Sequence, residues 1–307
     1  MKQRKYLIST QIGHLFNVVT TDEAYLYDRF RYLKDCGFEA IDYQMDAFLP
    51  GELIWEKNVN DFWDADLETL YQYFAPTKKA LYDSGLVFSQ AHASFPVYKP
   101  DNGEINDYMI MVMEKSLAVC RFLGCPALVV HPYMDFQDVN PEREYPANLA
   151  MYRKLIPAAK KYGVTVCLEN YYQEVAIQSR MIDELNAEAG DKHFGFCLDI
   201  GHANHNSDGD FCKYIQILGE RLTCLHIHEN DGANDSHMIP FTQTKGGYDF
   251  AQTNYAGMIR GLKEIGYEGN LSFETFRGLD AVPKEVEPEV LKLISAIGRY
   301  FRAKLEE

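Results

Sequence analysis

Six short apolar runs each end on, or just before, a side chain that can bind a metal ion. Apolar residues occupy consecutive positions in these runs, which is the pattern of parallel strands that are buried on both faces. The terminal side chains lie 39, 38, 30, 27 and 48 positions apart, and each step matches the length of one strand, one helix and their loops. They are His92, His131, Glu169, Asp199, His226 and Glu274.

This spacing predicts an α/β fold, a (β/α)8 TIM barrel. In such a barrel the carboxyl ends of all strands meet on one face, so these six residues converge on one cavity. Residues 6–11 and 40–43 supply two further strands and complete a count of eight. For any single one of these polar residues, a hydrogen bond at the end of a strand is a sufficient explanation. Six such residues at equivalent strand ends predict an active site, because burying unpaired imidazoles and carboxylates is costly.

The pattern of apolar residues predicts helices between the strands, and the chain forms a single domain over residues 1–307. Gly124, Gly163, Gly190 and Gly266 each follow a predicted helix, as left-handed helix caps do. The predicted helices cover residues 21–37, 104–123, 147–162, 179–189, 254–265 and 287–305.

The segment over about residues 45–66 is long and rich in aromatic and acidic residues, among them Trp55. We predict an insertion over the barrel mouth that acts as a lid, since long structured loops at this position commonly do so. The alternative is that this segment only packs on the surface of the barrel and does not act as a lid.

The amino-acid composition disfavours several classes of function. The net charge of −15 makes nucleic acid an unfavourable partner, because a phosphate backbone needs clustered positive charge. No apolar run is long enough to span a membrane or to form a signal peptide. The cysteines lack paired spacing and three lie in predicted strands, which predicts buried thiols in a reducing cytoplasm. The seven are Cys36, Cys120, Cys125, Cys167, Cys197, Cys212 and Cys224.

Three carboxylates and one imidazole, from Glu169, Asp199, Glu274 and His226, form a ligand set that suits one divalent ion: Mn²⁺, Mg²⁺, Co²⁺ or Zn²⁺. Glu169 and Glu274 could move protons beside a substrate carbonyl while the ion stabilises an enediolate. That chemistry is sugar isomerisation or epimerisation. Two or three ions on a larger ligand set could instead hydrolyse a phosphodiester.

Three segments carry a resemblance to a known family: residues 167–170 (Cys-Leu-Glu-Asn), residues 198–204 (Leu-Asp-Ile-Gly-His-Ala-Asn), and residues 226–237, which begin His-Ile-His-Glu-Asn-Asp-Gly and end Asp-Ser-His. Over nearly its whole length the chain resembles the xylose isomerase-like barrel superfamily, which holds sugar isomerases and epimerases as well as family-2 apurinic endonucleases. The resemblance implies that Glu169, Asp199, His226 and Glu274 hold the metal. It also implies that Glu169 and Glu274 transfer protons and that His202 orients the substrate.

The sugar-enzyme interpretation implies a metal-dependent isomerase or epimerase of a sugar, a sugar phosphate or a polyol. Gly232 stands where epimerases of free ketohexoses carry an arginine, which favours another isomerase of the group. Lys245 would meet an acidic or phosphorylated substrate, or else be a solvated loop lysine. A homo-oligomer is common among such enzymes. The substrate-binding residues would be His92, His131, Trp55, His228 and Lys245.

The alternative is a zinc-dependent apurinic endonuclease like endonuclease IV. The resemblance implies up to three Zn²⁺ ions for such an enzyme, and every ligand position has a matching residue type in this chain. Beyond the four residues above, the ligands would be His92, His131, His202, Asp235 and His237.

Overall fold

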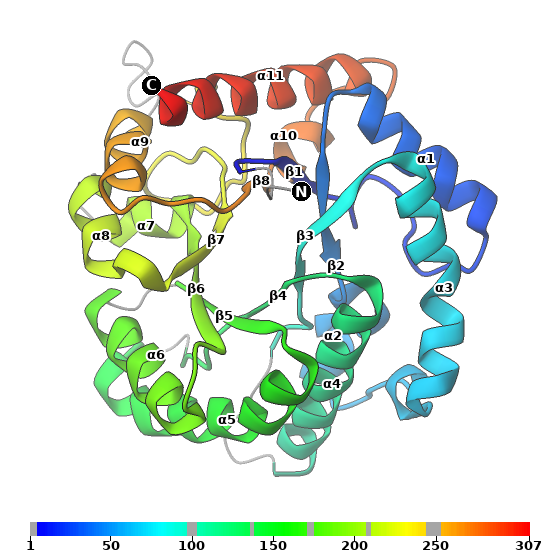
Figure 1. Cartoon of the computed structure of the whole chain (residues 1–307), viewed down its shortest axis with the longest axis vertical. Helices are drawn as coiled ribbons and strands as arrows, with labels where there is room; N and C mark the ends of the chain where they lie inside the picture. Colours follow the sequence, from blue (N-terminus) through cyan, green and yellow to red (C-terminus); the bar gives the residue numbers. More distant parts are fainter. Residues whose placement is uncertain (1–4, 97–102, 136–137, 171–174, 207–209, 244–252) are drawn as a thin grey trace.

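The structure is a computed structural model that describes residues 5–96, 103–135, 138–170, 175–206, 210–243 and 253–307. Strands and helices alternate along the chain, and Figure 1 shows the strands at the centre of a ring of helices. The strands are β1 (Ile8–Gln11), β2 (Ala40–Gln44), β3 (Val87–His92), β4 (Ala127–Val130), β5 (Thr165–Glu169), β6 (Phe194–Asp199), β7 (Leu222–His226) and β8 (Leu271–Phe273).

All neighbouring strands pair in parallel, in the order β7-β6-β5-β4-β3-β2-β1-β8. The ring closes just beyond β7, where Ile227 forms a parallel bridge with Phe273. The Ile227 amide donates to the Ser272 carbonyl at 2.8 Å, and the Glu274 amide donates to the Ile227 carbonyl at 3.1 Å. The predicted TIM barrel is therefore confirmed.

The helices fall close to the predicted ranges, with two early starts. The helix predicted from about 147 begins at Pro141, where Asn140 caps its N-terminus and a first-turn proline needs no amide hydrogen. The helix predicted from about 179 begins at Val175. The helices of four or more residues are α1 (Glu23–Asp35), α2 (Gly51–Trp55), α3 (Leu67–Ser84), α4 (Gly103–Leu123), α5 (Pro141–Tyr162), α6 (Val175–Ala189), α7 (Ile200–Asn206), α8 (Phe211–Leu218), α9 (Tyr255–Glu264), α10 (Phe276–Asp280) and α11 (Glu287–Glu306).

The left-handed caps predicted from glycine are confirmed. Gly124, Gly163, Gly190 and Gly266 have φ values of +81°, +61°, +81° and +66°. Residues with a Cβ rarely adopt this conformation, so glycine at these four positions ends each helix at little conformational cost.

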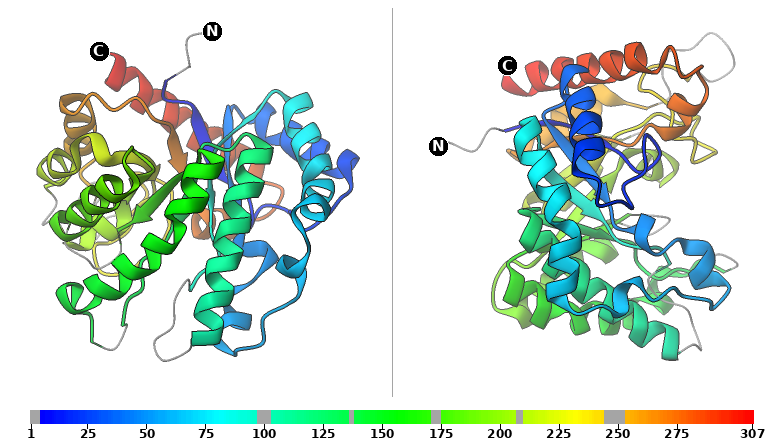
Figure 2. Two further views of the ribbon diagram at one scale, coloured as in Figure 1. Left: turned by 60° about the horizontal axis from the view of Figure 1, so that its bottom comes forward. Right: turned by 90° about the vertical axis from the view of Figure 1, so that its right-hand side faces the viewer.

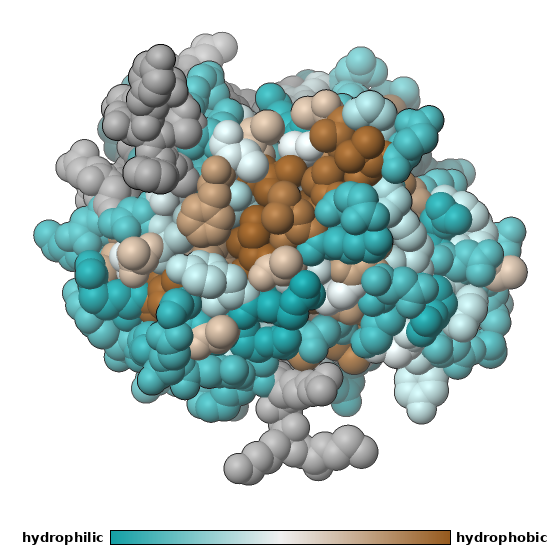
Figure 3. All heavy atoms as spheres, turned by 90° about the horizontal axis from the view of Figure 1, so that it is seen from above, coloured by the Kyte–Doolittle hydropathy of each residue, from teal (hydrophilic) through white to brown (hydrophobic). Residues whose placement is uncertain are grey.

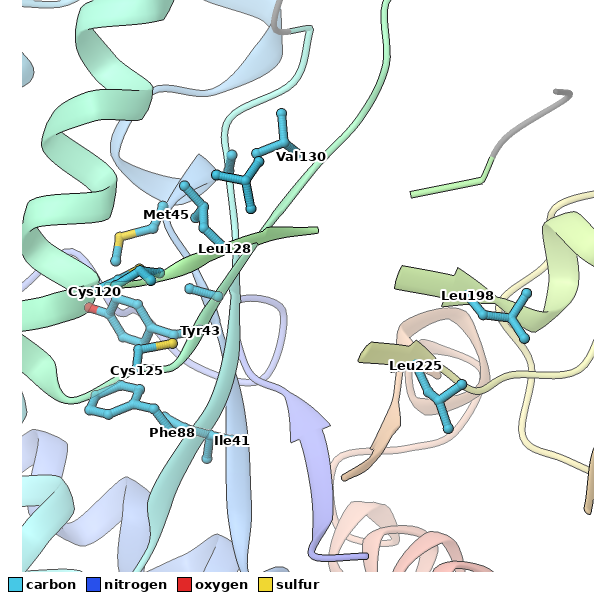
Figure 4. Packing of buried hydrophobic residues seen from close by; sticks show 14 of the residues in the cluster. Ile41, Tyr43, Met45, Phe88, Cys120, Cys125, Leu128, Val130, Leu198 and Leu225 are labelled. Carbon is cyan, nitrogen blue, oxygen red and sulfur yellow. The ribbon is translucent and has the colours of Figure 1, made fainter. Parts of the chain in front are cut away.

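Strand alternation divides the core in two. Outward-facing residues of the strands pack against the helices, as Figure 4 shows for Tyr43, Phe88 and Leu128 beside α4. Inward-facing residues fill the base of the barrel with small side chains. This inner cluster consists of Ala127, Val129, Cys167, Cys197 and Cys224.

All seven cysteines are free and buried, as the sequence predicted. Within the part of the chain that the structure describes, no helix combines the length and apolarity that crossing a membrane requires. The cytoplasmic location stays a prediction.

Helix α11 packs beside β1 and β8, and its outer face carries exposed apolar side chains beside the charged Glu289, Lys292 and Arg299. Val286 and Leu293 are exposed, and Figure 3, which views the molecule from this side, shows apolar side chains gathered there. Such patches often mark contacts between proteins. The homo-oligomer nevertheless stays a prediction.

The segment over residues 45–66 lies at the carboxyl ends of the strands, beyond β2 (Figure 2). Phe48 and Trp63 are buried, and the Phe48 ring packs against Phe74 of α3. The Lys115 ammonium donates to the carbonyls of Trp63 and Ala65. These contacts anchor the segment. Its residues Asp46, Ala47, Pro50, Gly51 and Glu52 line the cavity described below. Its action as a lid stays a prediction.

Candidate active site

Side chains two positions apart on a strand point to the same side, so the residues that follow the inner cluster also face the barrel interior. These residues form a polar layer. Two positions after Cys167, Cys197 and Cys224 stand Glu169, Asp199 and His226, all fully buried at the carboxyl ends of β5, β6 and β7. Glu274 follows β8 by one residue and completes the group. One ligand atom from each of these four residues lies within 4.8 Å of the others.

The His226 imidazole lies at the centre of this group. Its Nδ1 is 3.0 Å from Glu169 Oε1, 3.1 Å from Glu274 Oε2 and 4.0 Å from Asp199 Oδ2. Three carboxylates gathered around one ring nitrogen, deep in the protein, repel one another unless a cation lies among them. This donor set of hard oxygen atoms and one imidazole fits a divalent ion.

Two further histidines contact the other oxygen of Glu169. His92 Nε2 lies 3.3 Å and His131 Nε2 lies 3.2 Å from Glu169 Oε2. Burial would raise the pKa of Glu169, but His131, His226 and His92 hold that pKa well below its ordinary value. Burial lowers the pKa of His131 to about 4, whereas the hydrogen bond to Glu169 outweighs burial at His92 and raises its pKa to about 9. Glu169 is therefore ionised and held between histidines.

A second group of ligand types lies beside the first. One atom each from His228, Asp235 and His237 lie within 4.8 Å of one another, with His237 Nε2 3.0 Å from Asp235 Oδ2. His228 Nε2 also lies 3.0 Å from Asp199 Oδ1. The alternative interpretation grouped His202 with Asp235 and His237; in the structure His202 Nε2 lies 3.4 Å from Asp235 Oδ2, and His228 completes the tighter group.

The first turn of helix α7, which begins directly after β6, positions His202. Its amide donates to Asp199 Oδ1 at 2.7 Å, and its Nδ1 lies 2.8 Å from the Asn170 carbonyl oxygen. Burial lowers the pKa of His202, but Asp199 and Asp235 outweigh burial and raise that pKa to about 10. Burial raises the pKa of Asp199, and His202 and His228 reverse this and lower it to about 2. The start of α7 therefore holds a cationic imidazole beside an ionised carboxylate.

A cavity of about 590 Å³ opens above these groups. His92, His131, His202, Asp235 and His237 line it together with both glutamates. Trp55 and His228 are not among the lining residues that the structure describes: Trp55 is 44% exposed on α2, and His228 is fully buried behind the cavity wall. Lys245 lies outside the described residues.

Sequence analysis missed Asp42, which is fully buried in the barrel interior. Its Oδ2 lies 3.1 Å from His226 Nε2 and accepts a hydrogen bond from Gln90 Nε2 at 2.8 Å. The Ser272 hydroxyl donates to the same oxygen at 3.4 Å. The signal was present, because an aspartate inside a strand of apolar residues must have a partner.

We expect Asp42→Asn to weaken divalent-metal binding by about 10- to 100-fold. Asp42 accepts from His226 Nε2–H, so Nδ1, which lies among the carboxylates, is the nitrogen available to bind the ion. An amide at this position loses the charge and can turn its NH₂ toward the ring, favouring the other tautomer. Isothermal titration with Mn²⁺ measures the change.

Gln90→Leu is the matched comparison for Asp42→Asn, because it removes a neutral donor to the same carboxylate without touching His226. We expect a smaller loss of metal affinity. Equal affinity of wild type and Asp42→Asn would contradict the positioning role of Asp42.

The barrel fold agrees with comparisons to known proteins. A family model described as "Xylose isomerase-like TIM barrel" matches residues 30–294. The uncharacterized protein MJ1311 of Methanocaldococcus jannaschii is 29% identical over 213 residues, which cover 66% of this chain and 70% of that protein.

Among solved structures, the crystal structure of D-psicose 3-epimerase in the presence of D-fructose matches 96% of this chain and 99% of its own, with a TM-score of 0.69 and 14% identity. The 3-keto-D-glucoside 4-epimerase from E. coli matches 96% of this chain and 100% of its own, with a TM-score of 0.67 and 17% identity. At these identities the likeness establishes the shared fold.

Proposed function

This chain belongs to the xylose isomerase-like TIM barrel family, and we propose that it is a divalent-metal-dependent sugar isomerase or epimerase. The observation that carries the proposal is the group of Glu169, Asp199, Glu274 and His226 at the floor of a polar cavity. Solved sugar epimerases that share the fold support the same reaction class.

Glu169, Asp199, His226 and Glu274 would hold the ion. When bound, a divalent cation polarises a substrate carbonyl and stabilises the negative charge of the enediolate that forms beside it. Mn²⁺, Mg²⁺, Co²⁺ and Zn²⁺ all accept such a ligand set.

The two glutamates would carry the proton. Glu169 and Glu274 both line the cavity and belong to strands on different sides of His226, so each can reach a carbon next to the carbonyl. Gln11 Nε2 donates to Glu274 Oε1 at 2.8 Å, and His92 and His131 contact Glu169 Oε2. These contacts fix the carboxylates and leave their remaining lone pairs for a substrate. His202, cationic at the cavity wall, would orient a substrate oxygen.

Solvent exchange tests the proposal. The Mn²⁺-loaded protein is incubated in D₂O with a panel of ketoses and their phosphates, and deuterium incorporation next to the carbonyl is followed by NMR. We expect exchange into at least one sugar, and none after chelation. A metal-loaded protein that exchanges no proton into any of these sugars would contradict the proposed function.

One observation favours a second candidate, a zinc-dependent apurinic endonuclease. Three groups of metal-ligand type lie side by side, which is enough for three ions: the four-residue group, the group of His92, His131 and Glu169, and the group of His228, Asp235 and His237. Elemental analysis of protein purified without chelator separates the candidates. One ion per chain supports the isomerase; three zinc ions with nicking of abasic DNA support the endonuclease.

A further inference from the structure

The end of β2 and the segments that follow β1 and β2 bring into the cavity three polar side chains that the proposed proton transfer does not use. They are His14, Gln44 and Asp46. Each has a buried atom without a hydrogen-bond partner among the described residues: His14 Nε2, Gln44 Nε2 and Asp46 Oδ1. A buried polar atom left without a partner costs about 1–3 kcal/mol. Three such atoms on one cavity wall indicate that a ligand supplies their partners.

The backbone fixes the orientation of the Gln44 amide. Gln44 Oε1 accepts from the Ile12 amide at 2.8 Å and from the Gly13 amide at 2.5 Å, and the side chain is only 3% exposed. Because those donors define the oxygen end, the NH₂ end presents hydrogens without a protein acceptor in the described part of the chain. Gly13 allows this contact, since a Cβ there would lie 2.9 Å from Gln44 Cγ.

His14 is a neutral partner at physiological pH. Burial lowers its pKa to about 4, so its Nε2 can donate or accept one hydrogen bond and does not attract an anion by charge. The Phe276 ring, 5.8 Å from the imidazole, forms an apolar wall beside it. Asp46 completes the wall as an acceptor or, since burial raises its pKa, as a donor.

The charge of the cavity argues against an anionic substrate. Five carboxylates line the cavity, and its described lining contains no lysine or arginine. Asp46 and Glu52 lie on the same segment, and both line the same cavity as His14. A phosphate dianion there would meet like charge, because the cationic imidazoles of the lining, His92 and His202, are already paired with Glu169, Asp199 and Asp235. Hydroxyl groups, in contrast, can both donate and accept.

We propose that His14, Gln44 and Asp46 form a subsite that binds hydroxyl groups of an uncharged sugar and selects it over the phosphorylated sugar. The proposal rests on the proposed function and names its substrate class. Alternating donors and acceptors along a polyol chain match the Gln44 donors, the Asp46 acceptor and the neutral imidazole.

The test compares matched ligands on the Mn²⁺-loaded enzyme. Dissociation constants are measured by titration for D-fructose and D-fructose 6-phosphate, and for D-ribulose and D-ribulose 5-phosphate. We expect each free ketose to bind at least about tenfold more tightly than its phosphate, a difference of about 1.4 kcal/mol. Deuterium exchange from D₂O follows the same preference.

Three variants assign this preference to the subsite. Asp46→Asn should strengthen phosphate binding and reduce the discrimination at least about threefold. Gln44→Glu keeps the acceptor for the Ile12 and Gly13 amides but replaces the free donors, and should weaken free-ketose binding about tenfold, as should His14→Phe. Mn²⁺ affinity should stay unchanged in all three. Asp64→Asn is the matched control, since Asp64 is exposed on the same segment outside the cavity.

The outcomes separate the subsite from the function. Exchange into sugar phosphates in preference to free sugars overturns the subsite and leaves the isomerase standing. A metal-loaded protein that binds and exchanges neither kind of sugar overturns both. A change of discrimination in Asp64→Asn as large as in Asp46→Asn also overturns the subsite.

Discussion

Replacing either glutamate of the site by glutamine should lower proton exchange into substrate by about 10²- to 10⁴-fold, the usual contribution of a positioned acid or base. Glu169→Gln and Glu274→Gln keep the size and one oxygen of each side chain but remove the group that accepts the proton. Deuterium incorporation from D₂O with saturating Mn²⁺ measures the loss.

Metal content must be measured in the same samples, because both residues also belong to the ligand group. A variant that retains the ion and loses exchange identifies a proton-transfer residue. Glu56→Gln makes the same chemical change at an exposed residue outside the cavity and should exchange at the wild-type rate. Full exchange in both site variants would contradict the proposed roles.

Gly201→Ala should destabilise the protein by about 3 kcal/mol, at the upper end of the cost of overpacking a core. A Cβ at Gly201 would lie 2.0 Å from His228 Cε1 and 2.8 Å from Asn230 Nδ2. His228 would have to leave Asp199, and a buried carboxylate would lose a partner. Denaturant unfolding monitored by circular dichroism measures the free energy of unfolding.

Gly103→Ala is the matched control, because Gly103 begins α4 and a Cβ there meets nothing within 4 Å. We expect no loss of stability from it, or a small gain. If Gly201→Ala unfolded at the same denaturant concentration as wild type, the packing argument for Gly201 would be wrong.

Gly201 also shows a packing constraint that the sequence motif does not reveal. In the structure Gly201 lies in α7 without a positive φ, and its missing side chain makes room for the His228 ring. His228 lies just beyond β7, more than 20 positions along the chain from Gly201, and no local pattern shows that its ring approaches this glycine.

The fold was predictable because each βα unit carries its own local signals. Consecutive apolar residues marked β4, β5 and β6, and glycines marked the helix ends. The convergence of Glu169, Asp199, His226 and Glu274 followed from the same signals, since barrel closure brings all strand ends to one face.

The polar residues that surround this metal-ligand group were not predictable from the sequence. Asp42, Gln44 and His14 lie on β2 or on the loop after β1, and their importance comes from neighbours on other strands: His226 for Asp42, and the Ile12 and Gly13 amides for Gln44. Trp55, chosen from its type alone, lies outside the cavity lining that the structure describes.

The sequence by itself therefore determined the barrel and the residue types at its mouth, because strand periodicity and helix capping act over a few residues. The tertiary structure decided which nitrogen of His226 faces the carboxylates, which histidine joins Asp235 and His237, and which polar atoms remain free to meet a substrate. These are properties of side-chain packing between distant strands, and they exist only once the barrel has closed.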